Sequence, residues 1–193
     1  MSSVYWYCLL GVIGLGIVIF TVIRKKHVTE FSNYIVFYLF VTCIPWIGEF
    51  TVLGLFNAYT YRIGVYENLW AQNLFAHLVL NSTLWPATAT LIGAYSLGYG
   101  WISLIAVANT LIEYLFITLG IYEQHWWRYY MTFLAVFIFM SFAKYWFKKM
   151  NNTRHGAIRT ATLYFVAFVV IHYPIPFTLL FGKQYYKINW ASD

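Results

Sequence analysis

Long apolar segments recur along the whole 193-residue chain, and charged residues make up only 9% of it. A soluble domain carries about 25% charged residues because its surface must be hydrated. So few charges cannot cover an ordinary globular surface, and they also exclude a disordered chain, collagen, a coiled coil and a nucleic-acid-binding domain. The sequence therefore predicts an all-α fold, a polytopic helical bundle with the lipid bilayer as its main partner.

Six segments are long and apolar enough to cross a hydrocarbon core of about 30 Å, which takes about 20 helical residues. They form one transmembrane domain, and the predicted spans are residues 4–23, 33–57, 69–95, 100–121, 129–147 and 160–182. Pro45 and Pro86 lie inside the second and third spans, where we expect kinks. The first segment has no basic residues before it and no A-x-A cleavage site, so we expect a retained span rather than a signal peptide.

Basic residues gather in alternate loops, which indicates the orientation of the chain. The predicted inside loops are 24–32, 96–99 and 148–159, and most basic residues lie in or next to the two longer ones: Arg24, Lys25, Lys26, Lys144, Lys148, Lys149, Arg154 and Arg159. Under the positive-inside rule, loops 58–68 and 122–128 and the tail from Lys183 lie outside. We therefore expect a multi-pass plasma-membrane protein with both termini extracytoplasmic. The net charge of +6 then reflects topology and not a nucleic-acid partner.

Aromatic residues cluster at the predicted span boundaries. The outer clusters are Tyr5, Trp6, Tyr7, Trp70, Trp126, Trp127, Tyr129, Tyr130, Tyr185, Tyr186 and Trp190, and the inner one is Tyr145 with Trp146. Such amphipathic rings settle at membrane–water interfaces, so we expect these residues to anchor the bundle in the bilayer.

Two heptapeptides suggest an internal repeat. Residues 64–70 resemble residues 120–126, at an offset of 56, and each copy lies between an even-numbered and an odd-numbered span. Spans 2–3 and 4–5 would then be two helical hairpins in a parallel repeat, with Asn57 aligned to Glu113. The alternative is that both copies are simply favourable outer turns.

The residues that point to function are the ionisable ones inside spans, because a charge at mid-membrane costs about 2.5–3.5 kcal/mol on insertion scales. These residues are Glu49, His77, Glu113 and His172. Helical spacing adds Asn73 and Asn81 to the face of His77, Asn109 to that of Glu113, and Thr42 and Asn57 to that of Glu49. Lipid cannot solvate these polar stripes, so we expect the stripes of spans 2, 3 and 4 to face one another in the outer half of the membrane.

The candidate ligand- or ion-binding residues are therefore Glu49, His77, Asn81, Asn109, Glu113 and His172, the last because the following residues 173–176 break the helix. Two carboxylates and a histidine suit proton relay, cation binding or acid–base chemistry; interhelical packing through polar contacts is the alternative. No P-loop, GxSxG, HExxH or dinucleotide motif is present. Glu123 and His125 are too few for a metal site. We expect no cofactor and no metal, and the sequence identifies no catalytic residue.

Three functions are compatible with this pattern. The first is a binding or transport-type bundle for a small molecule, ion or lipid, with an outward-opening polar pocket. The second is a membrane-embedded enzyme that modifies a lipid or isoprenoid with the same carboxylates. The third is a structural component that binds partner chains as a homo- or hetero-oligomer. The small size and the lack of a soluble domain favour the first and third.

The stretch from Ile112-Glu113-Tyr114 to Trp126-Trp127, with residues 106–109 before it, resembles small integral membrane proteins of unknown function from spore-forming Gram-positive bacteria. These proteins share an Ile-Glu-Tyr inside a span and a short loop that ends in Trp. The likeness extends over residues 35–150, but residues 64–68 replace a Tyr-Pro-type element of that group. It implies a bacterial plasma membrane. Gly120-Ile121-Tyr122 after a Glu-bearing span also resembles short helical lycopene cyclase membrane domains, and no catalytic role is carried over from them.

Overall fold

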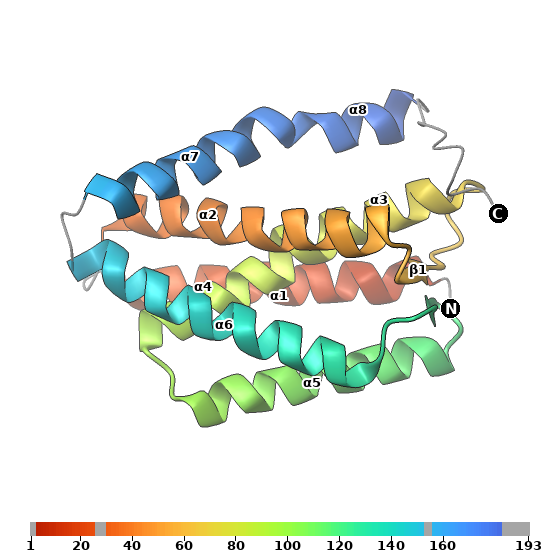
Figure 1. Cartoon of the computed structure of the whole chain (residues 1–193), viewed down its shortest axis with the longest axis horizontal. Coiled ribbons are helices and arrows are strands. Elements are labelled where there is room, and N and C mark those ends of the chain that lie inside the picture. Colours follow the sequence, from red (N-terminus) through yellow and green to blue (C-terminus); the bar gives the residue numbers. More distant parts are fainter. Residues whose placement is uncertain (1–2, 26–29, 153–155, 183–193) are drawn as a thin grey trace.

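A computed structural model describes residues 3–25, 30–152 and 156–182. Within these residues the chain forms six helical segments that run side by side (Figure 1). Their bounds are α1 Val4–Lys25; α2 Phe31–Glu49, continued by the π-helical η1 Phe50–Leu55; α3 Leu69–Val79, η2 Leu80–Leu84 and α4 Trp85–Tyr95; α5 Tyr99–Thr118; α6 Tyr129–Asn152; and α7 Gly156–His172 with α8 Pro174–Gly182. The all-α bundle is confirmed.

Five of the described segments are long and apolar enough to cross a membrane: Val4–Lys25, Phe31–Leu55, Tyr99–Thr118, Tyr129–Asn151 and Gly156–Phe181. This is the pattern of a multi-pass membrane protein. The segment from α3 to α4 is not among these five; it is the most buried and carries the most buried polar side chains, which are Gln72, His77, Asn81, Ser82, Thr88 and Thr90. It lies inside the bundle because its amides and imidazole find partners there and would find none in lipid.

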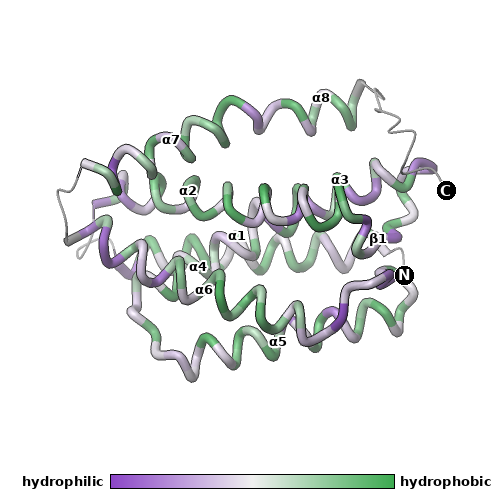
Figure 2. Tube along the Cα trace, in the orientation of Figure 1, coloured by the Kyte–Doolittle hydropathy of each residue, from purple (hydrophilic) through white to green (hydrophobic). Residues whose placement is uncertain are grey.

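The other helices surround this polar segment. α1, α2 and α6 all pack against α4, while α5 packs on α6 and α7 packs on α2 (Figure 1). The main apolar core lies between α2, α4 and α6, where the Phe40 ring stacks on Trp146 with centroids 4.8 Å apart. Figure 2 shows hydrophobic residues along the middle of the helices and hydrophilic ones gathered towards the ends.

Proline shapes the middle of the segment from α3 to α4, which we call the central segment. Pro86 has no N–H to donate to the carbonyl of Ser82, four residues earlier, and η2 immediately precedes this position. The hydroxyl of Tyr38, from α2, donates to this carbonyl at 2.5 Å. A side chain from a neighbouring helix thus satisfies the backbone oxygen that the proline leaves free.

Two short strands at one end of the bundle are an addition to the predicted fold. β1 Tyr59–Tyr61 and β2 Tyr122–Gln124 pair antiparallel, with Thr60 opposite Glu123. The N-terminal end of α1 and the C-terminal end of α8 lie at this same end (Figure 1). The described helices therefore alternate in direction as the six-span prediction requires. Lys26, Arg154 and the predicted tail from Lys183, with Tyr185, Tyr186 and Trp190, lie outside the described residues.

The predicted alignment of Asn57 with Glu113 is wrong. Asn57 and Gly120 are the equivalent residues: each has a positive φ, 46° and 68°, and each ends a helix directly before a strand. The structural offset is therefore 63 residues between these two positions. Gly64 also has a positive φ of 76° but follows β1, so it is not the counterpart of Gly120.

Two aromatic residues assigned to the membrane interface are instead packing residues. Tyr7 is fully buried, and its hydroxyl donates to the carbonyl of Ile121 at 2.8 Å. Trp146 is half-buried and donates from Nε1 to Oγ1 of Thr162 at 3.0 Å. A tyrosine in the first turns of a span can point inwards as readily as outwards, and spacing along the chain does not distinguish the two.

Close contact between α1 and η2 generates a prediction about Gly14. A Cβ there would lie 2.6 Å from the backbone N of Leu84 and 2.7 Å from the carbonyl carbon of Thr83, so α1 would have to move. We expect Gly14→Ala to lower the free energy of unfolding by about 1–3 kcal/mol, as overpacking does. Thermal unfolding in detergent micelles measures this. Gly16→Ala on the same helix meets no atom of the described residues within 4 Å and should change little; equal losses in both variants would contradict the contact.

Candidate functional site

Glu49 lies at the junction where α2 becomes the π-helical η1, and its side chain is buried. Its Oε1 accepts a hydrogen bond from the hydroxyl of Tyr61 at 2.7 Å. Its Oε2 lies 3.1 Å from Nδ1 of His77 and also accepts from Nδ2 of Asn81. The π segment follows Pro45, and such segments frequently occur at functional sites. The carboxylate thus joins α2, β1 and the central segment.

The contacts of His77 are compatible with two protonation states. Its Nδ1 lies 3.1 Å from Glu49 Oε2 and 2.9 Å from Asn81 Nδ2. A protonated ring donates from Nδ1 to Glu49 and forms an ion pair. A neutral ring accepts from Asn81 at the same nitrogen. In both states Glu49 keeps hydrogen bonds from Tyr61 and Asn81, so its carboxylate is not left unpartnered.

Other polar side chains of α3 hold the loop that carries β1. Asn73 Oδ1 accepts from the backbone N–H of Tyr61 at 2.7 Å. Gln72 Oε1 accepts from the N–H groups of Ile63 and Gly64 at 2.6 and 2.9 Å. These bonds place β1 against α3, and they give Asn73 a structural role at the end of the His77 stripe.

Glu113 is in a different situation, although it is equally buried, with 8% of its surface exposed. Its Oε1 accepts from Nε2 of Gln124 at 3.0 Å. Its Oε2 is buried and accepts no hydrogen bond from the described residues. An unsatisfied buried acceptor costs about 1–3 kcal/mol, and more when it is charged, so this oxygen requires an explanation.

Glu113 lines a cavity of about 110 Å³. Polar or aromatic side chains make up much of its wall: Tyr59, Tyr61, Trp85, Asn109, Phe116, Tyr122, Trp127 and Thr132. Leu10, Leu80, Leu84, Ile112 and Ala135 complete the lining. The amide of Asn109 donates to the carbonyl of Ile105 at 2.9 Å, which leaves its Oδ1 as a second acceptor beside Glu113.

Three tyrosines of the strands lie between the two carboxylates. The rings of Tyr59 and Tyr122 have centroids 5.1 Å apart, and those of Tyr61 and Tyr122 are 5.2 Å apart. Burial raises the pKa of all three phenols well above the usual value, and the nearby charge of Glu49 raises each pKa further. The three hydroxyls therefore stay protonated and act as neutral donors and acceptors.

The structure brings together Glu49, His77 and Asn81 in one hydrogen-bonded cluster, and places Asn109 and Glu113 at the neighbouring cavity. Tyr61 contacts both groups, since it donates to Glu49 and lines the cavity. His172 is elsewhere: its Nδ1 lies 2.8 Å from the carbonyl of Phe168, on its own helix. It stacks on the Phe168 ring with centroids 4.1 Å apart, and takes no part in either group.

Tyr59, Tyr61 and Tyr122 are site residues that the sequence interpretation missed. They lie in loops that the sequence predicts to be exposed. The helical spacing of polar residues identifies faces of helices only, so it cannot identify residues that a short strand places inside the bundle. Glu123 and His125 are committed to loop contacts: Glu123 pairs with Arg62 at 2.5 Å, and His125 Nδ1 lies 2.8 Å from the carbonyl of Asn57. Within the described ranges, no three His, Cys, Asp or Glu side chains cluster as metal ligands would.

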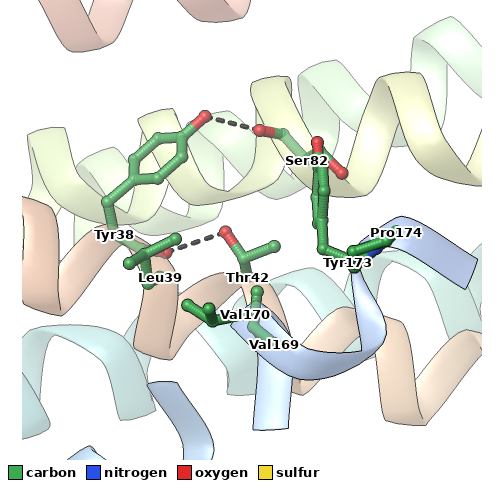
Figure 3. A pocket seen from close by; sticks show the side chains of 8 residues that line it. All are labelled: Tyr38, Leu39, Thr42, Ser82, Val169, Val170, Tyr173 and Pro174. Carbon is green, nitrogen blue, oxygen red and sulfur yellow. Dashed lines mark hydrogen bonds between the residues drawn. The ribbon is translucent and has the colours of Figure 1, made fainter. Parts of the chain in front are cut away.

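A second cavity, of about 320 Å³, lies between α2, η2 and the junction of α7 with α8 (Figure 3). Its lining is Tyr38, Leu39, Thr42, Ser82, Val169, Val170, Tyr173 and Pro174. None of the described residues that line it is charged, and the hydroxyls of Tyr38 and Thr42 bond to backbone carbonyls. The cavity therefore offers apolar surface but no counterion.

Comparison with known proteins returned no match: no family model, no curated protein and no solved structure is significantly similar to this chain.

The Glu49 cluster generates a prediction about Tyr61. Tyr61→Phe removes a hydrogen bond to a buried carboxylate, and we expect the free energy of unfolding to fall by about 1.5–3 kcal/mol. Thermal unfolding in detergent micelles measures the loss. Tyr130→Phe, at a residue that is 60% exposed, is the matched control and should be within about 0.5 kcal/mol of the parent. Similar stability of the two variants would show that the Tyr61–Glu49 bond contributes little.

Proposed function

We propose that the protein is a small-cation-binding, transport-type bundle in which Glu113 is the counterion for the bound ion. The observation that carries this proposal is the buried Oε2 of Glu113, which accepts no hydrogen bond from the described residues and belongs to a side chain that lines a cavity. A bound cation would supply the missing donor or positive charge.

The charges around the two carboxylates support this assignment. Glu49 has an internal counterion, because His77 lies 3.1 Å away and can carry a proton. Glu113 has no such neighbour: the ion pairs within the described part of the chain are Glu49–His77 and Arg62–Glu123. Buried charges in proteins are paired or neutralised, so a cation from outside the chain would stabilise Glu113 in its ionised form.

The contacts of Glu113 disfavour a purely structural role. A polar residue that holds spans together forms hydrogen bonds from one helix to another. Glu49 does this, since it bonds to side chains of the central segment. The protein bond of Glu113 is instead to Gln124, in the strand that follows its own helix. The cavity volume of about 110 Å³ also favours an ion over a lipid or isoprenoid substrate, and so disfavours the enzyme alternative.

The cellular setting is part of the proposal. We infer a bacterial plasma membrane, with the strand-bearing end of the bundle outside and the basic loops inside. Support comes from the position of Arg24, Lys25 and Lys149, which lie in the last turns of α1 and α6 at the end opposite the strands (Figure 1). The cavity beside the strands would then open towards the extracytoplasmic side.

Neutralising Glu113 tests the function. In lipid nanodiscs, we expect a panel of monovalent cations to include at least one that raises the melting temperature of the parent protein, because binding to the native state stabilises it. Glu113→Gln should insert and fold but lose this response by at least tenfold in apparent affinity. Glu123→Gln, at a half-exposed loop acid, should keep it. Failure of every cation to stabilise the parent, or failure of Glu113→Gln to accumulate in the membrane, would contradict the proposal; the second result would support a structural role.

Cysteine labelling tests the orientation. The native Cys8 and Cys43 are first replaced by alanine, and then Glu67→Cys or Gly98→Cys introduces one thiol in an exposed loop position at either end of the bundle. A membrane-impermeant maleimide should label Glu67→Cys in intact cells and label Gly98→Cys only after permeabilisation. The reverse pattern would place the termini inside.

A further inference from the structure

The two carboxylates occupy equivalent positions in the two helix–strand units. Asn57 and Gly120 end their helices with positive φ, and Tyr61 and Gln124 each lie four residues further on. Glu49 precedes Asn57 by eight residues and Glu113 precedes Gly120 by seven. The π-helical η1 accounts for the additional residue, because a π segment accommodates one residue more than an α-helix over the same length.

The first oxygen of each carboxylate has an equivalent partner. Tyr61 donates to Oε1 of Glu49 at 2.7 Å, and Gln124 donates to Oε1 of Glu113 at 3.0 Å. The strand ladder relates these donors by a local twofold, since Tyr59 pairs with Gln124 and Tyr61 pairs with Tyr122. The two halves therefore differ mainly at the second oxygen.

At Glu49 the second oxygen is contacted by two nitrogens from the span that follows, Nδ1 of His77 and Nδ2 of Asn81. At Glu113 the span that follows is α6, which lines the cavity with two small residues, Thr132 and Ala135. The hydroxyl of Thr132 accepts from Nε1 of Trp127 at 2.6 Å, and neither Thr132 nor another described residue donates to Oε2 of Glu113. Beside Glu49, the side-chain nitrogens of His77 and Asn81 occupy the space next to the second oxygen. Beside Glu113, the corresponding space is the cavity.

We propose that this cavity binds a small primary alkylammonium ion, whose N–H groups take at Glu113 the place that His77 and Asn81 take at Glu49. This inference rests on the proposed function and names its ligand class. One N–H of the ligand would donate to Oε2 of Glu113 and a second to Oδ1 of Asn109, which lies one turn earlier on α5. No covalent bond is made or broken and no proton is transferred, so the step is binding alone.

The cavity walls fit an organic cation. Tyr59, Tyr122 and Trp127 line it, and aromatic faces attract ammonium groups by roughly 0.5–2 kcal/mol or more as the site is desolvated. Leu80 and Ile112 provide apolar contact for an alkyl group. A hard divalent cation such as Ca²⁺ is usually bound by several carboxylates, and Glu113 is the one carboxylate among the described residues of the lining.

Volume limits the size of the ligand. An apolar cavity of about 150 Å³ accepts benzene, and this cavity measures about 110 Å³. An ion such as methylammonium or ethylammonium is therefore the expected size. Tetramethylammonium has no N–H to donate to Glu113, which makes it a useful comparison ligand with the same charge.

The test titrates the parent protein in nanodiscs with methylammonium, tetramethylammonium and potassium chlorides, and follows tryptophan fluorescence and melting temperature. We expect methylammonium to bind at least tenfold more tightly than the other two ions. Asn109→Leu should weaken methylammonium binding about tenfold and weaken tetramethylammonium binding much less, because only the primary ion donates to Asn109. Glu113→Gln should lose all responses.

The outcomes separate the two proposals. Equal affinity for potassium, tetramethylammonium and methylammonium, all lost in Glu113→Gln, would overturn the alkylammonium assignment and keep the cation site. Methylammonium binding that survives Glu113→Gln would overturn both, as would the absence of binding by any of the three ions at concentrations up to tens of millimolar.

Discussion

The hydrocarbon core offers no hydrogen bonds, so each polar group within it must find a partner in the protein. This constraint explains the arrangement of the bundle. The segment from α3 to α4 carries the largest share of amides and hydroxyls and is enclosed by α1, α2 and α6. The five segments around it are apolar on their outer faces. The carbonyl of Ser82 shows how far the rule extends, because Pro86 leaves it free and Tyr38 supplies the replacement donor.

The same constraint explains how much of the site was predictable from sequence. The spacing of His77 and Asn81 places them on one helical face, and the cost of burying Glu49 requires a partner for it. Together these predict that the stripes of spans 2 and 3 meet, and the structure brings Glu49, His77 and Asn81 into contact. The six predicted segments also coincide with the helical segments described here, with their ends shifted by a few residues.

The remainder depends on backbone geometry that residue types do not encode locally. Two loops that read as exposed connections form a strand pair, and this pair carries Tyr61 and Tyr122 back into the bundle. The matching heptapeptides occupy different places in the two helix–strand units, because Gly64 follows β1 whereas Gly120 precedes β2. The sequence match at an offset of 56 therefore leads to the wrong equivalence for Asn57. His172 is a sequence candidate because a helix break follows it, but its Nδ1 forms a hydrogen bond with the carbonyl of Phe168 on its own helix.

The two carboxylates show how one structural unit can serve two purposes. Both lie in the last turns of a helix, both receive a donor from the strand that follows, and both are buried. What differs is the next span: α3 contributes an imidazole and an amide, and α6 contributes a threonine and an alanine. Because nitrogen donors from another span contact the first carboxylate, that carboxylate holds neighbouring helices together. Because the side chains beside the second carboxylate are small, that carboxylate keeps an acceptor oxygen without a hydrogen bond from the described residues, next to a cavity. An acceptor and a cavity are the minimum that a binding site requires.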